Sequence, residues 1–186
     1  MRIIAGEFRG RTILSPGTNQ TRPITDRVKQ SVFDMLSPSL PDAIVYDLFA
    51  GTGSLGLESI SRGCKYATFF DSDRSAQSLL KKNIAVLKLE DRAKIIAGDL
   101  FTWFAAAPAL AAPADILFLD PPYRFLTERP GDLRALAENI VSKHLSPIGR
   151  IIFRHDRADS LDLPGLHPLD IRDYGSMRVE FLSARP

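Results

Sequence analysis

Three glycines in one short turn are the first residues of this sequence whose spacing suggests chemistry. Gly51, Gly53 and Gly56 form a G-x-G-x-x-G pattern between an apolar run and a helical pattern. The first two glycines allow the backbone to turn tightly near a ligand, and the third allows helix to pack on strand. Asp71 ends the next apolar run, where a carboxylate would meet ribose hydroxyls. On these residues alone, a nicotinamide dinucleotide and S-adenosylmethionine are nearly equal candidates, because both present an adenosine.

Two further carboxylates favour S-adenosylmethionine. Asp47 precedes the glycine turn inside the expected strand, where it would attract the ammonium group of the methionine end and repel a pyrophosphate. Asp99 follows the third expected strand and can accept a hydrogen bond from the adenine amine. A competing interpretation makes Asp47 a capping or turn carboxylate beside the glycine-rich loop.

The segment Asp120-Pro121-Pro122-Tyr123 follows the fourth expected strand, at the edge where open α/β sheets bind ligands. An exocyclic base amine is a poor nucleophile, because its lone pair is delocalised into the ring. Acceptors on the Asp120 carboxylate and the Pro121 carbonyl would localise that lone pair, and the prolines would fix the backbone. Tyr123 offers a stacking surface, typically worth ~1–3 kcal/mol per base. The element therefore predicts direct methyl transfer to a base amine, which the protein promotes by positioning and electrostatics. The alternative interpretation is a turn that merely ends the strand.

These residues need strands that alternate with helices. Strands are expected over residues 44–49, 66–70, 94–97, 116–119 and 150–153, and helices over residues 55–61, 74–88 and 133–141. This alternation predicts a mostly parallel sheet with helices on both faces. Residues 167–174 and 177–184 are separated only by Gly175-Ser176, so they must pair as an antiparallel hairpin. The expected fold is the α/β, Rossmann-like fold of class I methyltransferases.

A basic extension precedes the alternating pattern. Residues 3–4 and 12–14 predict a small β-hairpin, and Thr25 is expected to cap a helix that runs to about Leu36. Before residue 30 the basic residues are Arg2, Arg9, Arg11, Arg22, Arg27 and Lys29, against only Glu7 and Asp26. Such an arm suits phosphate contacts, with an ordinary solvated surface as the alternative. We expect one domain over residues 1–186, with an extension over 1–37 and a catalytic core over 43–186.

Length and composition restrict the remaining classes. The 186 residues are 45% hydrophobic and 25% charged, as in an ordinary globular domain. Cys64 is the single cysteine and the histidines lack a metal-ligand spacing, so neither a disulfide nor a metal site is expected. Neither a signal peptide nor an apolar run near the ~20 residues of a membrane span is present, which predicts a cytoplasmic protein. The net charge of +2 argues only weakly for a polyanionic partner.

Taken together, the motifs resemble those of the RsmD-type methyltransferases. The matching segments are residues 1–6, 8–11, 22–29, 47–58 and 120–123, so the resemblance covers essentially the whole chain. It implies methylation of the N2 amine of one guanine in 16S ribosomal RNA, within an assembled or assembling small subunit, with S-adenosylmethionine as cofactor. It also implies that Phe49 belongs to the cofactor site, that Thr25 and Arg27 touch the cofactor carboxylate, and that Arg9, Arg11 and Arg22 contact RNA.

One residue departs from the family pattern. Asp71 stands where the family usually has Glu, so Asp73 or a water could share the ribose contact. Asn83 matches a family position and is expected to tie helix to loop. Three other functions stay open: a methyltransferase for adenine or cytosine amines of DNA, a non-catalytic RNA- or nucleotide-binding module and, more distantly, a nicotinamide oxidoreductase. Against the first, the chain has no room for a separate target-recognition domain. A monomer is expected.

Overall fold

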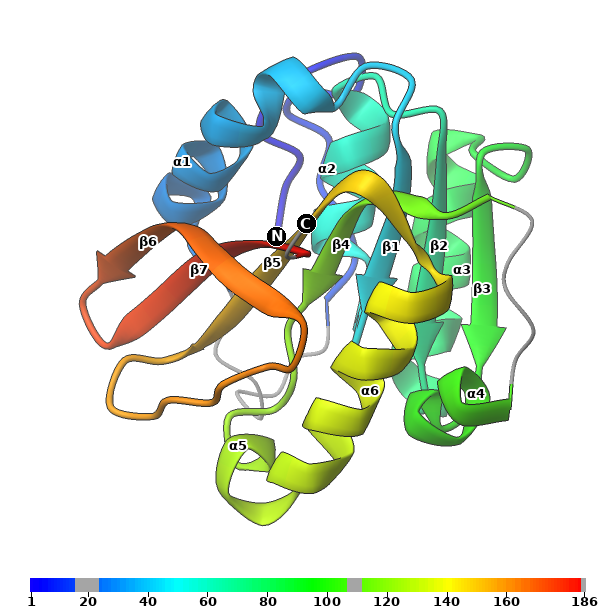
Figure 1. Ribbon diagram of the computed structural model, residues 1–186. Coiled ribbons are helices and arrows are strands. Elements are labelled where there is room, and N and C mark those ends of the chain that lie inside the picture. Colours follow the sequence, from blue (N-terminus) through cyan, green and yellow to red (C-terminus); the bar gives the residue numbers. More distant parts are fainter. Residues whose placement is uncertain (16–23, 107–111, 185–186) are drawn as a thin grey trace. The chain divides into compact units, whose positions relative to one another are not determined.

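The structure is a computed structural model that describes residues 1–15, 24–106 and 112–184. The chain divides into two compact units. The first unit is Met1–Gly98 and the second is Asp99–Pro186. Within the described residues, no helix is both long and apolar enough to cross a membrane. Both units are built from strands with buried apolar side chains and helices packed beside them (Figure 1).

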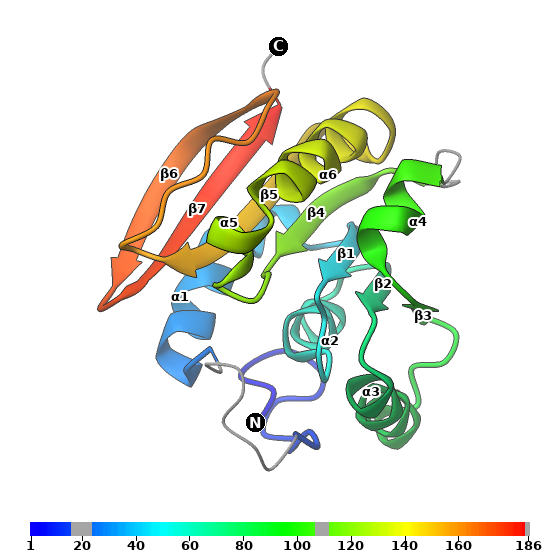
Figure 2. The same ribbon diagram turned by 90° about the horizontal axis from the view of Figure 1, so that it is seen from below.

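The first unit contains three parallel strands in the order β3-β2-β1. Its elements are α1 (Asp26–Leu36), a 3-10 turn at Ser37–Ser39, β1 (Ile44–Leu48), α2 (Ser54–Ser61), β2 (Tyr66–Asp71), α3 (Arg74–Leu87) and β3 (Ala93–Ala97). Figure 2 shows α2 and α3 on the same side of these strands. The apolar runs of the sequence predicted each of these strands and helices to within one or two residues. The glycine turn joins β1 to α2, as expected.

The second unit begins parallel and ends antiparallel. Its elements are α4 (Leu100–Ala106), β4 (Ala114–Leu119), α5 (Phe125–Glu128), α6 (Pro130–Lys143), β5 (Leu145–Asp156), β6 (Leu166–Tyr174) and β7 (Met177–Ala184). Strand β5 pairs with β4 in parallel and with β7 antiparallel, and β7 pairs antiparallel with β6. The antiparallel hairpin predicted around Gly175-Ser176 is confirmed. Strand β5 is longer than predicted at both ends.

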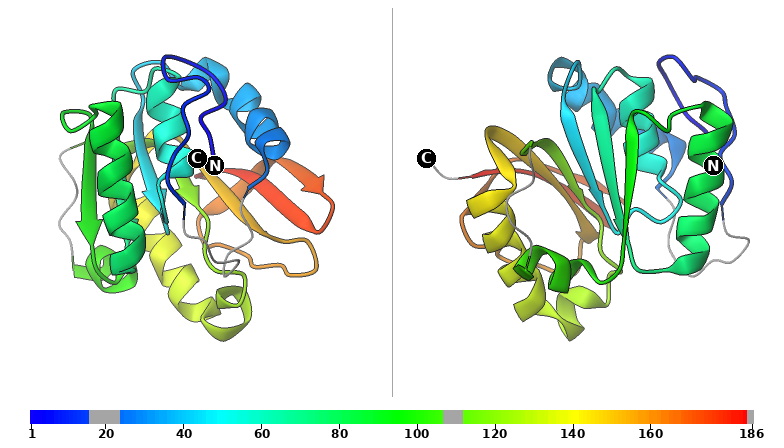
Figure 3. Two further views of the ribbon diagram at one scale, coloured as in Figure 1. Left: turned by 180° about the vertical axis from the view of Figure 1, so that it is seen from behind. Right: turned by 90° about the vertical axis from the view of Figure 1, so that its right-hand side faces the viewer.

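The N-terminal segment forms less of a hairpin than predicted. One antiparallel bridge joins Arg2 to Thr12. Backbone hydrogen bonds around it run from the Ile3 N–H to the Arg11 carbonyl at 3.0 Å, from the Gly10 N–H to the Ile3 carbonyl at 2.9 Å and from the Ile13 N–H to the Met1 carbonyl at 3.0 Å. The amides in between turn to helix α2 instead. The N–H groups of Ile4 and Ala5 donate to the two carboxylate oxygens of Glu58 at 2.8 and 3.0 Å. Figure 3 shows the segment running beside α2. The hairpin ladder does not extend further because the next amides, those of Ile4 and Ala5, donate to the Glu58 side chain of α2.

Glu58 is the centre of a buried ionic cluster in the first unit. Its side chain is 0% exposed, and it lies 3.2 Å from Lys29 Nζ and 2.8 Å from Arg62 Nε. Lys29 is itself 1% exposed and also donates to the Arg2 carbonyl at 2.6 Å. Burial lowers the pKa of Lys29, while the charge of Glu58 acts in the opposite direction. The cluster therefore joins α1, α2 and the N-terminal segment.

Cys64 lies in the core between α2 and β2. The thiol is fully buried, and burial raises its pKa to about 12. A thiol with that pKa carries almost no thiolate at neutral pH, so it behaves as a small apolar side chain.

Candidate functional site

The glycine turn has the backbone geometry for which glycine is needed. Gly51 and Gly53 have φ values of +56° and +84°, in the left-handed region. Phe49, just after β1, also has a positive φ of 58°, a conformation that costs free energy for a residue with a side chain. Apart from Gly51 itself and its two chain neighbours, no described residue has an atom within 4 Å of the position that a Gly51 Cβ would occupy. The turn therefore leaves open space beside its backbone, which suits a closely approaching ligand.

Gly56 fulfils the packing role predicted for the third glycine. A Cβ at this position would stand 2.3 Å from Cε1 of the Phe69 ring. Phe69 lies on β2, opposite Asp47 of β1 in the parallel register. The missing side chain thus lets helix α2 pack directly against an aromatic ring of the neighbouring strand.

Asp47 makes the capping contact that the sequence allowed as an alternative. The side chain is 2% exposed, and its Oδ2 accepts a hydrogen bond from the Gly56 N–H at 2.8 Å. Helix α2 needs such a partner, because its N-cap, Gly53, has no side chain to bond the first turn. Asp47 therefore holds the glycine turn from the neighbouring strand end. A contact with the ammonium group of a ligand stays a prediction.

Asp71 also holds the glycine turn. One carboxylate oxygen accepts the Gly51 N–H at 2.6 Å, and the other accepts the Asp73 N–H at 2.8 Å. Burial raises the pKa of Asp71, against the effect of these hydrogen bonds. Asp73 is exposed and caps α3 by accepting from the amides of Ser75 and Ala76. The structure thus brings Asp71 to Gly51, and ribose binding by Asp71 or Asp73 stays a prediction.

The predicted residues of the N-terminal extension lie mostly on the surface. Thr25 caps α1, with its Oγ1 accepting the Val28 N–H at 3.3 Å, and Arg27 is exposed in the first turn. Arg9 and Arg11 are exposed beside Gly10. Arg22 lies outside the described residues. Contacts of these side chains with cofactor or RNA stay predictions.

Asn83 has the structural role predicted for it. Its Oδ1 accepts the Leu14 N–H at 2.7 Å, and its Nδ2 donates to the carbonyls of Leu14 and Thr52, each at 3.1 Å. One buried amide on α3 therefore fastens both the N-terminal segment and the glycine turn.

In the second unit, Asp99 precedes α4. It is exposed, and its Oδ1 accepts the Thr102 N–H at 3.1 Å, which caps the helix. Its predicted contact with an adenine amine stays a prediction.

The Asp-Pro-Pro-Tyr element follows β4 directly, as predicted. Pro121 is buried, and the Pro122 carbonyl accepts the Phe125 N–H at 2.8 Å, which starts the short helix α5. The Asp120 side chain is 17% exposed, so its carboxylate can still be reached from solvent. The element therefore presents Asp120 at the carboxyl end of a buried strand, on a backbone stiffened by two prolines.

Sequence reasoning missed Arg154, the partner of Asp120. Arg154 Nε lies 2.6 Å from Asp120 Oδ1, and Nη2 lies 2.6 Å from Oδ2, which makes a two-pronged ion pair. Its guanidinium also lies 5.8 Å from the centre of the Tyr123 ring. The signal that could have found it is a charged residue directly after the apolar run of the fifth expected strand, residues 150–153.

The described residues contain no group of three or more His, Cys, Asp or Glu side chains that could hold a metal ion.

The sequence matches known proteins over most of its length. The profile of the family described as "Conserved hypothetical protein 95" matches residues 1–183. YlbH of Bacillus subtilis, which bears the name of an rRNA methyltransferase, is 36% identical over 165 residues, covering 88% of this chain and 86% of its own. Ribosomal RNA small subunit methyltransferase D of Escherichia coli is 40% identical over 124 residues. That alignment spans 67% of this chain and 61% of the relative.

Solved structures agree with the fold. The methyltransferase yhhF from Escherichia coli is 28% identical, with a TM-score of 0.86 over 100% of this chain and 98% of its own. SMU.776, which was solved as a complex with SAH, shares the fold at 17% identity, with a TM-score of 0.66 over 83% of this chain and 48% of its own. The mostly parallel strands and the closing hairpin are thus those of the predicted class I methyltransferase fold. The chain belongs to the Conserved hypothetical protein 95 family, the RsmD-type methyltransferases that its motifs resemble.

Proposed function

We propose that this protein transfers a methyl group from S-adenosylmethionine to the N2 amine of a guanine in 16S ribosomal RNA of the small subunit. The observation that carries the proposal is the Asp-Pro-Pro-Tyr element, with a partly accessible Asp120 carboxylate at the end of β4. The names of two relatives, an rRNA methyltransferase and a small-subunit rRNA methyltransferase, support the substrate class.

The glycine turn fits the proposed cofactor. Open space beside Gly51 and the positive φ of Gly51 and Gly53 allow an adenosine-bearing ligand to approach the backbone. Asp71 holds the turn in this conformation through the Gly51 amide. When bound, the sulfonium supplies an electrophilic methyl group together with its own leaving group. The protein needs no covalent intermediate of its own for such a transfer.

Asp120 and the prolines act on the target amine. The carboxylate and the Pro121 carbonyl accept hydrogen bonds from the amine hydrogens, which localises the nitrogen lone pair. As the new N–C bond forms, the nitrogen gains positive charge, and the Asp120 carboxylate stabilises that charge. Once the methyl group is attached, the positively charged nitrogen is acidic and gives a proton to the Asp120 carboxylate or to water, so a strong base is unnecessary. To be bound in this way, the guanine must leave its stacked position among neighbouring bases, and it can then stack on the Tyr123 ring.

Two exposed arginines suit the RNA backbone. Arg9 and Arg11 flank Gly10 at the tip of the N-terminal segment, which the Glu58 side chain fastens to α2. Contacts of this kind set affinity and position without reading sequence. In this proposal the target guanine is selected by the shape of the ribosomal subunit around it.

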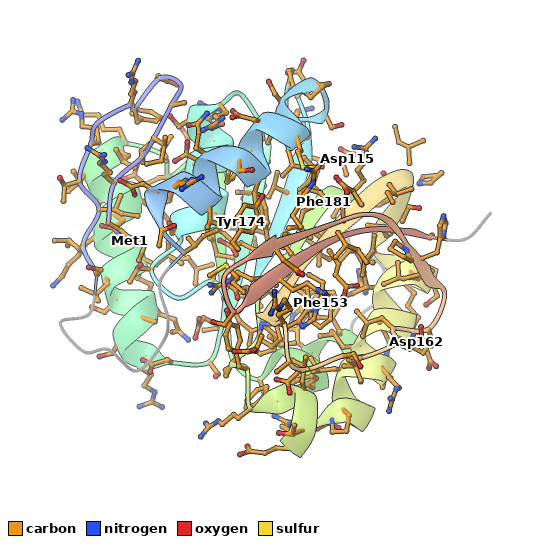
Figure 4. The ribbon with its side chains drawn as sticks, turned by 90° about the vertical axis from the view of Figure 1, so that its left-hand side faces the viewer. Met1, Asp115, Phe153, Asp162, Tyr174 and Phe181 are labelled. Atoms are coloured by element: carbon orange, nitrogen blue, oxygen red, sulfur yellow. The ribbon has the colours of Figure 1, made fainter. Side chains whose placement is uncertain are left out.

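The test is methylation with labelled S-adenosylmethionine, offered separately to unmethylated small subunits, naked 16S rRNA and DNA. We expect label in 16S rRNA, recovered as N2-methylguanine after digestion and mass spectrometry. Label in DNA alone would support the DNA amine methyltransferase and overturn the proposal. Asp120→Ala should abolish turnover yet leave S-adenosylhomocysteine binding within about twofold by calorimetry. Asp162→Ala, an exposed aspartate of the same unit (labelled in Figure 4), is the matched control.

A further inference from the structure

We propose that Arg154 is a positioning residue of this site, which rests on the function proposed above. Its buried guanidinium holds both the Asp120 carboxylate and the Tyr123 ring in the orientation that the target base needs. Arg154 does not itself contact the reacting atoms in this proposal. It acts through the two side chains of the Asp-Pro-Pro-Tyr element.

The strand register brings Arg154 to Asp120. Strands β4 and β5 pair in parallel, with Leu119, the last residue of β4, opposite Phe153. The residues that come next are Asp120, directly after β4, and Arg154 of β5. Phe153, labelled in Figure 4, marks this point on β5. A pair that arises from the register of two neighbouring strands has little freedom to separate. The contact is therefore part of the sheet, unlike a chance meeting of two surface side chains.

The ion pair is two-pronged and largely withdrawn from water. Arg154 is 9% exposed, and both of its hydrogen bonds to Asp120 measure 2.6 Å. Planar guanidinium matches planar carboxylate, so two parallel bonds fix the rotation of the Asp120 side chain as well as its position. Burial acts against the charge of Arg154, but the charge and hydrogen bonds of Asp120 outweigh it and raise the pKa of the arginine. Arg154 thus stays charged at every pH at which the protein would work.

The same guanidinium approaches the ring that would stack on the base. It lies 5.8 Å from the Tyr123 ring centre, within the range of a cation–π contact. Its Nη1 also lies 3.9 Å from Met177 Sδ on β7. Arg154 is therefore held by β7 while it contacts both Asp120 and Tyr123.

Pairing with Arg154 leaves Asp120 able to accept from an amine. An ionised carboxylate has about four lone-pair sites, and the two arginine bonds use one on each oxygen. The remaining sites can receive hydrogens of the base amine. Without Arg154, the carboxylate can rotate, and misplacement of a positioned group by about 1 Å costs about 10²-fold in rate.

The experiment is a double-substitution cycle on the full-length protein, with small subunits as substrate. Arg154→Gln should lower kcat about 10²-fold while S-adenosylhomocysteine binding stays within about twofold. Asp120→Asn keeps one acceptor oxygen and should retain measurable turnover. Adding Arg154→Gln to Asp120→Asn should then cost less than about threefold, because the arginine acts through the carboxylate. Arg178→Gln, which breaks another two-pronged pair with Asp173, is the control and should keep the kcat of the parent.

With an active wild-type protein, either of two outcomes overturns the inference. An unchanged kcat for Arg154→Gln removes any positioning role, and an equal loss with and without the Asp120→Asn substitution means that Arg154 acts independently. If Arg154→Gln does not fold, Arg154→Lys takes its place, because lysine keeps the positive charge but cannot form two parallel hydrogen bonds with the carboxylate. This variant should fold, with a kcat reduced about tenfold or more. Full activity of the folded Lys variant overturns the inference. Failure of the wild-type protein to methylate rRNA counts against the proposed function alone, and the cycle is read only where wild type is active.

Discussion

Substituting Glu58 by Gln tests how much the buried ionic cluster contributes to the fold. Glu58 accepts hydrogen bonds from the amides of Ile4 and Ala5 and from Arg62, and its charge faces the Lys29 ammonium at 3.2 Å. Gln keeps the shape but supplies one acceptor oxygen in place of two and carries no charge. Lys29, at 1% exposure, then keeps its ammonium buried without a carboxylate beside it.

The expected cost is large. Removing one member of a buried ion pair typically costs about 3–5 kcal/mol, because the other charge is left uncompensated. For a chain of this length, each kcal/mol lowers Tm by about 2–4 °C, so Tm should fall by roughly 6–20 °C. Part of the loss should appear as fraying of the N-terminal segment, since the amides of Ile4 and Ala5 share a single acceptor in the variant.

The pH dependence gives a second signature. Burial already lowers the pKa of Lys29 from 10.5, and removing the charge of Glu58 lowers it further. Between the lowered pKa and 10.5 the unfolded chain binds more protons than the folded one, so stability rises with pH. That window extends to lower pH in the variant. The destabilisation caused by Glu58→Gln should therefore shrink as pH rises from neutral toward 10.5.

Urea unfolding of both proteins at several pH values measures both effects. Hydrogen exchange at Ile4 and Ala5 reports the fraying. Glu138→Gln, on the exposed face of α6, is the matched control and should change stability by less than about 0.5 kcal/mol. The reasoning would be refuted if Glu58→Gln lowered Tm by less than about 2 °C, or if its destabilisation grew with rising pH.

Two further predictions concern packing and titration. Gly56→Ala places a Cβ 2.3 Å from the Phe69 ring, so it should cost about 1–3 kcal/mol in urea unfolding; Gly131→Ala, also helical but with open space around it, should be neutral or slightly stabilising. An equal effect of the two alanines contradicts the packing role. His144 is fully buried beside Phe104, and burial lowers its pKa from 6.5, so stability should fall as pH drops below 6.5. His144→Leu should flatten that decline, and a decline of unchanged slope would mean that other groups cause it.

Most elements of the fold followed from periodicity, because their apolar residues are close in sequence, whereas the short helices α4 and α5 were not among the predicted helices. The hairpin around Gly175-Ser176 was predictable for the same reason, since two residues leave no room for a crossover. The N-terminal hairpin is shorter than the sequence predicts. The amides of Ile4 and Ala5 donate to the carboxylate of Glu58, more than fifty residues away in the sequence, and no local sequence pattern predicts such a contact.

Site residues were predictable where a short motif requires a particular backbone conformation. They were not predictable where a side chain depends on a partner that is far away in the sequence. The tight turn at Gly53 and the packing role of Gly56 were predicted correctly, because a positive φ and a close aromatic neighbour exclude other residues, while binding of a ligand at the turn stays a prediction. Arg154 was missed, since its polar neighbours suggested that the strand ended at Phe153. The strand continues because Arg154 pairs with Asp120 and His155 lies 3.1 Å from Glu180, so both polar side chains are satisfied inside the sheet.

The burial of Lys29 in helix α1 was also not predictable, because it depends on partners that are far away in the sequence. A lysine among Val28, Val32 and Phe33 is normally expected to extend into solvent. It is buried because Glu58, the Arg2 carbonyl and Ser54 lie around its ammonium, and these partners come from three separate places in the chain.

The enclosed Cys64 thiol makes the natural chain a convenient background for chemical labelling. Since its pKa of about 12 and full enclosure suppress reaction with maleimides, a second cysteine placed on an exposed helix face would take up a fluorophore or spin label alone. Probes at Ser78 on α3 or Glu138 on α6 could then test the proposed binding of RNA in otherwise unaltered protein.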